Sequence, residues 1–479
     1  MGPNVLLVVM DTARADAFEP YGAATGSTPA VAQLARAGLV QRHAYAPASW
    51  TVPSHASMLT GLLPRDMGLT QAPGGTPHGV RSVMETLQNH LLPEQLRRAG
   101  WHTAGISANG WIAEHSGFAT GFDRWEEPMA DRTGGRLHPV ADRLGWYAQG
   151  LRAHVDDGAR AAEEILRDWL RDVTGRQPFF WFVNLVECHS PYLPPRPYND
   201  LSPLGRLRAA DEARRYLTFT GILRASAGGV EIPGGAIERM RHLYARSVRS
   251  MDDWLARVLE AMDKGGVLDD TLVIVTSDHG ENLGEGQMIG HALSLDERLI
   301  RIPFVSSHPL GLEPDHVLSL TDLPRLVADL VDLQDHPWGD GDLRSPTAVA
   351  QLDPMGGEAH PGLLEWVRDW GLDGEGTRRL TWPATAATDG RWKLVRRNDE
   401  ERLFDLVSDP LELRPLAVAA GAGVEPALMS SVTRLRAAVD AATEPRPVPG
   451  LSSPARVAPE ASAEELERIR RQMELLGYL

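Results

Sequence analysis

The sequence predicts an α/β protein with a doubly wound sheet, in which helices cover both faces of mostly parallel strands. Three short apolar runs rich in β-branched or aromatic residues lie at 5–10, 179–186 and 272–276, as expected of strands buried on both faces. Helical patterns fill the sequence between these runs. Strands that alternate with helices in this way indicate a doubly wound α/β core.

Turn residues mark the first helices. Thr28-Pro29 predicts a helix start, because proline is favoured at the first helical position, and Gly38 predicts the end of that helix. The order helix, glycine, short strand recurs from Leu87 to Ser107, where Gly100 separates the helix from the strand.

Two longer helices are expected further along the chain. Residues 156–173 carry apolar side chains at helical spacing, and residues 237–262 do the same. Between them, residues 191–235 are proline-rich and show little periodicity, over a length that is unusual for a connector. We expect this segment either to be an insertion that covers the substrate or to be disordered.

The carboxy-terminal part of the chain predicts a smaller unit. A short strand at 302–306 is followed by a stretch rich in Gly, Pro, Asp and Trp at 333–387, which suggests a domain seam. Short strands are then expected at 389–395 and 401–406. We therefore expect a catalytic α/β domain, a small α+β subdomain, and a linker with a terminal helix, at 1–375, 376–440 and 441–479.

The composition is that of an ordinary globular protein and limits its partners. The 48 basic and 64 acidic residues give a net charge of −16, which argues against nucleic acid as a partner but permits a small anionic substrate at a locally positive site. The single cysteine, Cys188, excludes an intramolecular disulfide and fits a reducing compartment. No run is long enough to span a membrane, and the run at 5–10 is too short for a signal peptide. We expect a cytoplasmic protein without membrane contact; the sequence predicts no oligomeric state.

Thr51 stands where a helix is expected to begin. The stretch from Ala46 to Gly61 is rich in hydroxyls and turns into a helical run. Unpaired backbone N–H groups and the positive end of the helix dipole meet at such a terminus, which suits an anion. Taken alone, Thr51 or Ser54 is as readily explained as a helix cap.

Polar residues follow the three predicted strands. They are Asp11 after the first, His189 after the second, and Asp278 with His279 after the third. In open α/β sheets, ligands bind beyond the carboxyl ends of the strands, so these side chains are expected to converge. Two aspartates and a histidine are ligands for a divalent cation, and the Thr51 hydroxyl would complete a set of four. The alternative for Asp278 and His279 is a turn built from good turn formers.

Several of these pieces resemble motifs of one family. In chain order, the matching stretches are Asp11–Asp16, Trp50–His55, His189–Tyr192, Ser277–Glu281 with Gly290–His291, Leu403–Pro410 and Leu475–Leu479. Together they are similar to the sulfatase/alkaline phosphatase superfamily, specifically its sulfatase-like branch. The resemblance implies an alkaline phosphatase-like sheet and one divalent metal ion (Mn, Mg, Ca or Zn). It also implies that Asp11, Asp278 and His279 hold the metal, and that Thr51 occupies the nucleophile position as a further ligand.

The chain departs from sulfatases at the positions that carry their chemistry. Sulfatases place a cysteine or serine at the nucleophile position and oxidise it to formylglycine, whereas threonine at Thr51 cannot become that aldehyde. His55 replaces an arginine of the same motif, and Thr12 replaces a second aspartate. The chain has two lysines, neither of them in a motif, and His291 lies where one is expected.

A metal-activated threonine is instead the device of superfamily relatives that act on phosphate esters. The resemblance with these departures therefore implies phosphate mono- or diesters as substrates, hydrolysed or transferred through a phosphothreonine at Thr51. Arg14 would stabilise the developing charge, and His189 or His291 would protonate the leaving oxygen. His55 and Tyr192 are candidate substrate-binding residues. One alternative is a sulfate-ester hydrolase that works without formylglycine, and another is a pseudoenzyme that binds an anionic ligand.

Overall fold

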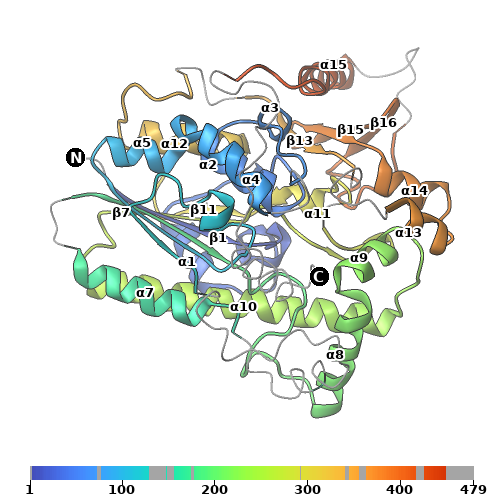
Figure 1. Cartoon of the computed structure of the whole chain (residues 1–479), viewed down its shortest axis with the longest axis horizontal. Helices are drawn as coiled ribbons and strands as arrows, with labels where there is room; N and C mark the ends of the chain where they lie inside the picture. The colour runs from blue at the N-terminus through green and yellow to red at the C-terminus, as the bar shows by residue number, and fades with distance from the viewer. Residues whose placement is uncertain are drawn as a thin grey trace.

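The computed structural model describes residues 3–72, 77–128, 147, 156–173, 177–291, 293–339, 345–354, 363–416 and 426–448. Within this part of the chain, a seven-stranded sheet with the order β2-β11-β7-β1-β6-β4-β5 forms the centre, and helices lie on both faces (Figure 1). Its strands are β1 (Asn4–Met10), β2 (Leu39–Val40), β4 (His102–Ser107), β5 (Arg124–Glu126), β6 (Phe179–Leu185), β7 (Thr271–Thr276) and β11 (Phe304–Ser306). The predicted fold class is confirmed.

The register of the central strands brings their carboxyl ends to one edge. β1 lies between β6 and β7 and is parallel to both, with Val9 opposite Asn184 on one side and Thr276 on the other. β4 and β5 continue the parallel order. At the far side, β11 pairs antiparallel with β7, and β2 pairs antiparallel with β11, so β2 again runs in the direction of the central strands. The residues that follow β1 and β7 therefore emerge side by side.

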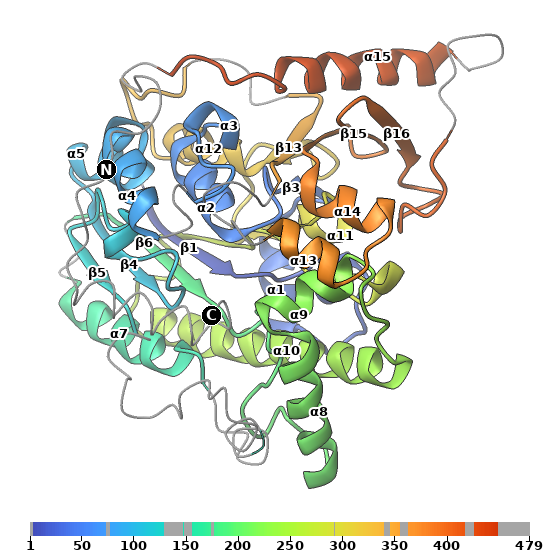
Figure 2. The same cartoon turned by 45° about the vertical axis from the view of Figure 1, so that its right-hand side comes forward.

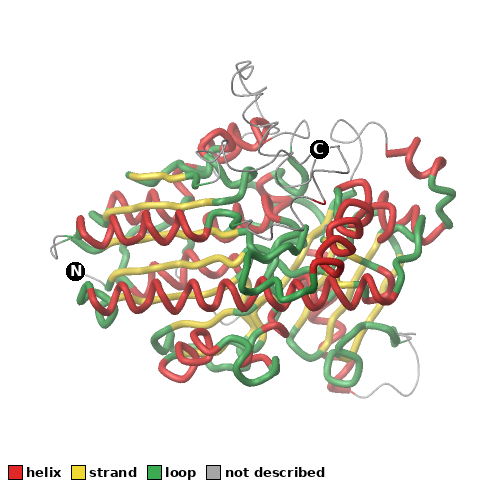
Figure 3. The backbone as a smooth tube through the Cα atoms, turned by 90° about the horizontal axis from the view of Figure 1, so that it is seen from below, coloured by secondary structure: helices red, strands yellow, loops and turns green. Residues whose placement is uncertain are grey.

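Alternate residues of β1 face two separate cores. Leu6, Val8 and Met10 pack under one layer of helices, and Val5, Leu7 and Val9 pack under the other. The first layer consists of α1 (Pro29–Ala37), α7 (Ala159–Asp172) and α10 (Gly234–Lys264). The second contains α2 (Thr51–Thr60), α3 (Pro64–Met67), α4 (Pro77–Thr86), α5 (Leu92–Arg98) and α12 (Leu323–Leu330). Seen from below, α10 runs along much of the sheet (Figure 3). Among the described helices, none has the length and apolar character needed to span a bilayer.

A second sheet lies beyond the edge where the central strands end. It has the antiparallel order β13-β14-β15-β16, with strands Ala348–Leu352, Ala384–Thr388, Trp392–Arg397 and Glu400–Asp405. Helix α15 (Pro426–Ala441) packs on it through Val432, Leu435 and Val439 (Figure 2). The expected domain boundary at residue 375 falls between β13 and β14. The first strand of this sheet therefore comes from the segment 333–387, which the sequence suggested to be a domain seam. The expected terminal helix at 463–476 lies outside the described residues.

The segment at 191–235 contains two helices, α8 (Pro203–Tyr216) and α9 (Phe219–Ser226). The Ser226 hydroxyl donates to the Ile289 carbonyl at 2.7 Å and accepts from the Ile289 amide at 3.0 Å. These two hydrogen bonds fix α9 to the small hairpin of β8 (Asn282–Leu283) and β9 (Ile289–Gly290). The remaining elements are β3 (His43–Tyr45), β10 (Arg301–Ile302), β12 (Val317–Ser319), α11 (Glu297–Ile300), α13 (Leu363–Asp369) and α14 (Gly374–Thr381).

Candidate active site

Asp11, Asp278 and His279 meet at the carboxyl edge of the central sheet. Each offers one ligand atom, and the three atoms lie within 4.8 Å of one another. All three side chains are fully buried. We call these residues the ligand cluster.

Short backbone contacts hold the two loops of the ligand cluster together. Thr12 adopts a left-handed conformation, with φ of 61°, that is uncommon for a β-branched residue. Its amide donates to Asp278 Oδ1 at 3.1 Å, and the Ala13 amide donates to Ser277 Oγ at 2.9 Å. Strained backbone of this kind persists where the surrounding contacts over-determine it, as they do here.

The contact of His279 Nδ1 with the backbone leaves Nε2 as an acceptor. Nδ1 lies 2.9 Å from the Gly280 carbonyl, so Nδ1 carries the hydrogen. Nε2 then presents a lone pair 3.2 Å from Asp278 Oδ2, which is itself an acceptor. Neither Asp278 Oδ2 nor Asp11 Oδ1 has a hydrogen-bond partner among the described residues. Two carboxylate oxygens and an imidazole nitrogen that face one another without a proton between them fit a divalent cation.

The electrostatics of the ligand cluster agree with this fit. Burial, reinforced by the Asp278 carboxylate, raises the pKa of Asp11 to about 7. Burial also lowers the pKa of His279 below its usual value. Burial would raise the pKa of Asp278 too, but His279 and His55 hold it below its usual value. Protein groups alone therefore leave Asp11 poorly compensated, whereas a bound cation would favour both carboxylates and the neutral imidazole.

Thr51 begins helix α2 directly above the ligand cluster. Its Oγ1 lies 3.3 Å from His279 Nε2, and its side chain is fully buried. Ser54 Oγ donates to the Asp278 carbonyl at 2.5 Å, which ties the first turn of α2 to the loop after β7. The structure thus brings together the four residues expected to bind the metal.

His55 lies behind the ligand cluster and is fully buried. Its Nδ1 is 3.0 Å from the Thr51 carbonyl and 3.4 Å from Asp278 Oδ2, and its ring packs edge-on against Phe118 and Phe182. The sequence suggested a substrate contact for His55. The observed contacts place it against Asp278, and the substrate contact stays a prediction.

Two further histidines, His189 and His291, lie beside His279. The His291 ring is 4.6 Å from the His279 ring and 5.1 Å from the His189 ring, measured between centroids. His291 Nδ1 is 2.9 Å from Glu281 Oε1, and His189 Nδ1 is 2.7 Å from the Ser190 carbonyl. Burial lowers the pKa of His291 to about 3 and raises that of Glu281 to about 7.

Arg14 and Tyr192 are placed differently from their expected roles. The Arg14 guanidinium donates to Asp16, to Glu285 Oε1 at 2.8 Å and to the Glu281 carbonyl at 3.2 Å. Two carboxylates already balance its charge, which leaves little of it to stabilise a transition state. Tyr192 is 2% exposed and packs edge-on against Tyr244, with ring centroids 5.5 Å apart.

Two residues of the site were not predicted. Asn109 donates to Asp11 Oδ2 at 2.7 Å, and Glu281 holds His291. Asn109 follows β4, another parallel strand of the sheet, so the strand-end rule that predicted Asp11 would also have found it. Glu281 lies inside the Ser277–Glu281 motif, but its partner His291 becomes evident only from the β8–β9 hairpin.

Comparison with known proteins agrees with this geometry. The model of the sulfatase family matches residues 3–333. The chain belongs to the sulfatase family. It is 25% identical to the choline-sulfatase of Rhizobium meliloti over 478 residues, which covers 91% of this chain and 86% of that protein. It is 26% identical to the multifunctional alkaline phosphatase superfamily protein PehA of Trinickia caryophylli, over 63% of this chain and 67% of that protein.

A solved structure supports the fold of this sulfatase-family chain. The phosphonate monoester hydrolase of Agrobacterium radiobacter superimposes with a TM-score of 0.62 at 20% identity, covering 91% of this chain and 96% of that one. The predicted membership of the superfamily and the alkaline phosphatase-like sheet are both confirmed. The chain is a hydrolase of this superfamily.

Proposed function

We propose that this sulfatase-family chain cleaves phosphate mono- or diesters with Thr51 as the nucleophile, through a phosphothreonine. The observation that carries the proposal is the position of the Thr51 hydroxyl, which is buried at the start of α2 and lies 3.3 Å from His279 Nε2. Threonine cannot be converted to the formylglycine of sulfatases, so the hydroxyl oxygen of Thr51 must itself be the attacking atom. Similarity to a multifunctional alkaline phosphatase superfamily protein and to a phosphonate monoester hydrolase supports a phosphorus centre as the target.

Asp11, Asp278, His279 and Thr51 would hold one divalent cation, whose identity stays open among Mn, Mg, Ca and Zn. When bound, such a cation polarises the ester and lowers the pKa of a ligand hydroxyl, so that the Thr51 proton is lost to solvent. Asn109 fixes Asp11 through one carboxylate oxygen and leaves the other free for the cation. The Thr12 amide holds Asp278 through Oδ1, and Ser54 holds its backbone carbonyl.

The reaction then proceeds in two displacements. Thr51 Oγ1 forms a bond to phosphorus, the bond to the leaving oxygen breaks, and that oxygen takes a proton from His189 or His291. The first backbone N–H groups of α2 face the developing negative charge. Water, or an acceptor hydroxyl in the case of transfer, then attacks phosphorus and releases Thr51.

Intact-mass measurement tests the nucleophile. Brief exposure to p-nitrophenyl phosphate with Mn²⁺ is expected to add one phosphoryl group to the wild-type chain and none to Thr51→Ala. Thr60→Ala is a matched control, because Thr60 lies in the same helix and its hydroxyl donates to the Ala56 carbonyl. Phosphatase activity that survives Thr51→Ala would rule out the proposal.

Sulfate esters are the second candidate, because the choline-sulfatase match covers most of both chains. Turnover of p-nitrophenyl sulfate that exceeds turnover of the phosphate and persists in Thr51→Ala would favour this reading. A chain that binds no divalent metal and turns over neither ester would instead be a pseudoenzyme.

A further inference from the structure

A group of arginines lies beside the candidate active site, on the carboxy-terminal part of the chain. It consists of two residues of α14, one of β15 and one of β16, which are Arg378, Arg379, Arg397 and Arg402. We call these four residues the arginine cluster. Within 4.0 Å of their guanidinium groups, the described residues provide two carboxylates, those of Glu375 and Glu400. The arginine cluster is therefore a positive region on a chain whose net charge is −16.

Backbone carbonyls hold the guanidinium of Arg397. Its Nη1 donates to the Arg378 carbonyl and its Nη2 donates to the Leu293 carbonyl, each at 3.1 Å. Among the described residues, no carboxylate forms an ion pair with it. Burial lowers the pKa of Arg397 below its ordinary value, against the opposing effect of Glu375 and Asp296. Because a carbonyl positions a guanidinium without carrying a net charge, the positive charge of Arg397 stays available to an anion.

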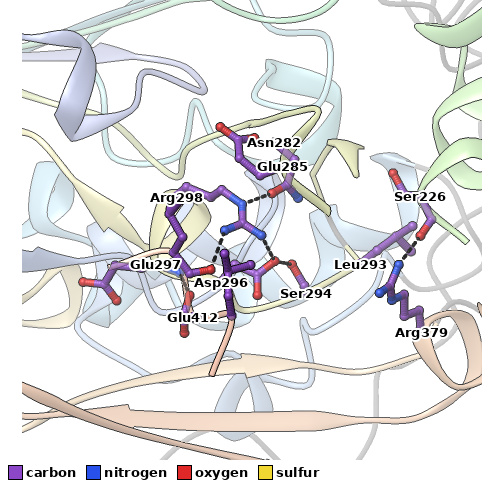
Figure 4. Close-up of polar contacts among 12 residues, drawn as sticks. Ser226, Asn282, Glu285, Leu293, Ser294, Asp296, Glu297, Arg298, Arg379 and Glu412 are labelled. Carbon is purple, nitrogen blue, oxygen red and sulfur yellow. Dashed lines mark hydrogen bonds and ion pairs between the residues drawn. The ribbon is translucent and has the colours of Figure 1, made fainter. Parts of the chain in front are cut away.

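Arg379 is held in a similar way. Its Nη1 donates to the Ser226 carbonyl of α9 at 2.9 Å, and its Nε lies 3.6 Å from Glu375 Oε1 (Figure 4). Glu375 is shared, since it also accepts from Arg378 at 3.0 Å and lies 3.8 Å from Arg402. One carboxylate does not neutralise three guanidinium groups, so part of the charge of Arg379 is likewise uncompensated.

The two carbonyls that hold these arginines belong to segments next to the ligand cluster. Ser226 also binds Ile289 through its hydroxyl, and Ile289 precedes His291 by two residues. Leu293 follows His291 by two residues. Two residues of extended chain span about 7 Å at most, and the His291 ring lies 4.6 Å from the ring of His279. The two guanidinium groups are therefore anchored to both sides of a histidine that adjoins a proposed metal ligand.

We propose that Arg379 and Arg397 bind a second anionic group of the substrate, so that the chain prefers esters whose alcohol part carries a carboxylate. The inference rests on the proposed function for the ester that is cleaved, and it adds which class of ester is selected. Both side chains are half-buried, so a ligand can reach them. A guanidinium already fixed by carbonyls loses little freedom on binding, and its planar fork matches the two oxygens of a carboxylate. The positive region also attracts an anionic ester that the net charge of the chain would repel.

Pairs of aryl phosphates that differ only in charge test this preference. The phosphates of 3-carboxyphenol, 4-carboxyphenol and 4-(carboxymethyl)phenol are each compared with the corresponding uncharged carboxamide, in the presence of Mn²⁺. We expect the wild type to favour at least one carboxylate over its carboxamide by roughly tenfold or more in kcat/KM, mostly through KM. In Arg379→Gln and Arg397→Gln the preference is expected to fall by roughly tenfold, because a hydrogen bond to a charged group contributes about that much to binding.

Two further variants separate binding of the anion from a structural role. Arg397→Lys keeps the charge and is expected to keep part of the preference, whereas a structural role of the two carbonyl bonds would be lost equally in Arg397→Gln and Arg397→Lys. Arg301→Gln is the matched control. The Nε of Arg301 also donates to a backbone carbonyl, that of Arg42 at 3.0 Å, but on β10, which belongs to a different sheet. This variant is expected to show the preference of the wild type, and Arg379→Gln serves as the test if Arg397→Gln does not fold.

Calorimetric titration with ligands that are not hydrolysed separates this inference from the proposed function. Benzylphosphonates with a carboxylate in the meta or para position, and their carboxamides, are titrated into the chain with Mn²⁺. We expect a carboxylate to bind more tightly than its carboxamide to the wild type and to Arg301→Gln, and the difference to shrink by roughly tenfold in Arg379→Gln.

The two measurements together assign any failure. If the chain cleaves no phosphate ester but shows this difference in binding, the proposed function is wrong and the binding of a second anion stands. If the chain cleaves phosphate esters through Thr51, and neither kinetics nor titration distinguishes the carboxylates from the carboxamides, this inference is overturned and the proposed function stands. A preference that survives in both Arg379→Gln and Arg397→Gln would also overturn it.

Discussion

Asn109 shows how much one neutral side chain contributes to the ligand cluster. Its amide donates to Asp11 Oδ2 at 2.7 Å, and its own Oδ1 accepts from the Trp111 amide at 2.9 Å. We expect Asn109→Ala to weaken Mn²⁺ binding by roughly 10- to 100-fold, since partners that orient metal ligands usually carry that much affinity. Calorimetric titration measures this. Asn89→Ala, which removes a surface acceptor of Arg98, is expected to leave the affinity unchanged. Equal affinities in the two variants would contradict the orienting role.

Asp322 gives a pH dependence that is separate from the site. Its side chain accepts from the Ser319 amide at 2.8 Å, which closes the capping box of the short 3-10 helix Leu320–Asp322 before α12, and burial raises its pKa to about 6. Because the folded pKa lies above the unfolded value of 3.8, its contribution to stability is complete below pH 4 and is lost as the pH rises through 6. Asp322→Asn keeps the acceptor without the charge. We expect the free energy of unfolding of the variant, relative to that of the wild type, to rise by on the order of 2 kcal/mol from pH 4 to pH 8. Urea unfolding at both pH values measures the gain, and a difference that does not change with pH would contradict it.

Single residues also show where prediction from the sequence ends. Asp11, Asp278 and His279 could be predicted together because each follows a strand, and parallel strands end at one edge. The ion pair between Arg14 and Glu285 could not be predicted, because only the β8–β9 hairpin brings Glu285 to Arg14. His55 was assigned to the substrate from its motif alone, and only the packing of α2 on the sheet shows that it faces Asp278.

At the scale of elements, the long periodic segments were the predictable ones. The helix expected at 237–262 is observed as Gly234–Lys264, and the buried strands agree to within a residue or two. The helices of the 191–235 segment were missed because they are short and lie among prolines, and each begins at a side-chain cap. Ser202 and Thr218 accept from the Gly205 and Gly221 amides at their first turns.

The contact between the β7 loop and α11 predicts a cost for any side chain at Gly280. An added Cβ would lie 2.0 Å from the Arg298 carbonyl, which is backbone and cannot turn away. We expect Gly280→Ala to lower stability by about 1–3 kcal/mol, as overpacking does, and to weaken Mn²⁺ binding because His279 must move with the loop. Gly234→Ala is the control, since its Cβ would meet nothing within 4 Å. Denaturant unfolding and metal titration measure the two effects, and a Gly280→Ala chain that matches the control in both would show that the loop can adapt.

At the scale of the molecule, a buried charge joins the carboxy-terminal sheet to α11, the helix that packs against the loop after β7. Lys393 of β15 is fully buried and lies 2.7 Å from Glu412 and 3.5 Å from Glu297 of α11. Glu297 in turn accepts from the Tyr45 hydroxyl of β3 at 3.0 Å. Residues 348–416 are thereby attached to α11, whose Arg298 carbonyl lies against Gly280 in the loop after β7. We therefore expect the carboxy-terminal sheet and the central sheet to unfold together.

Removing that lysine tests the coupling between the sheets. Lys393→Met leaves two buried carboxylates without their cation, and breaking a buried ion pair in this way costs about 3–5 kcal/mol. We expect urea unfolding of Lys393→Met to shift by that amount, and Lys393→Met/Glu412→Gln to recover part of it because one uncompensated charge is gone. Fluorine NMR of the chain labelled with 5-fluorotryptophan resolves single tryptophans, so the signals of Trp181 in β6 and Trp392 in β15 report each sheet separately. If the joint couples them, the wild type shows one coincident transition and Lys393→Met shows the Trp392 signal moving first. Two separate transitions in the wild type would mean that the sheets unfold independently and that Lys393 stabilises only its own.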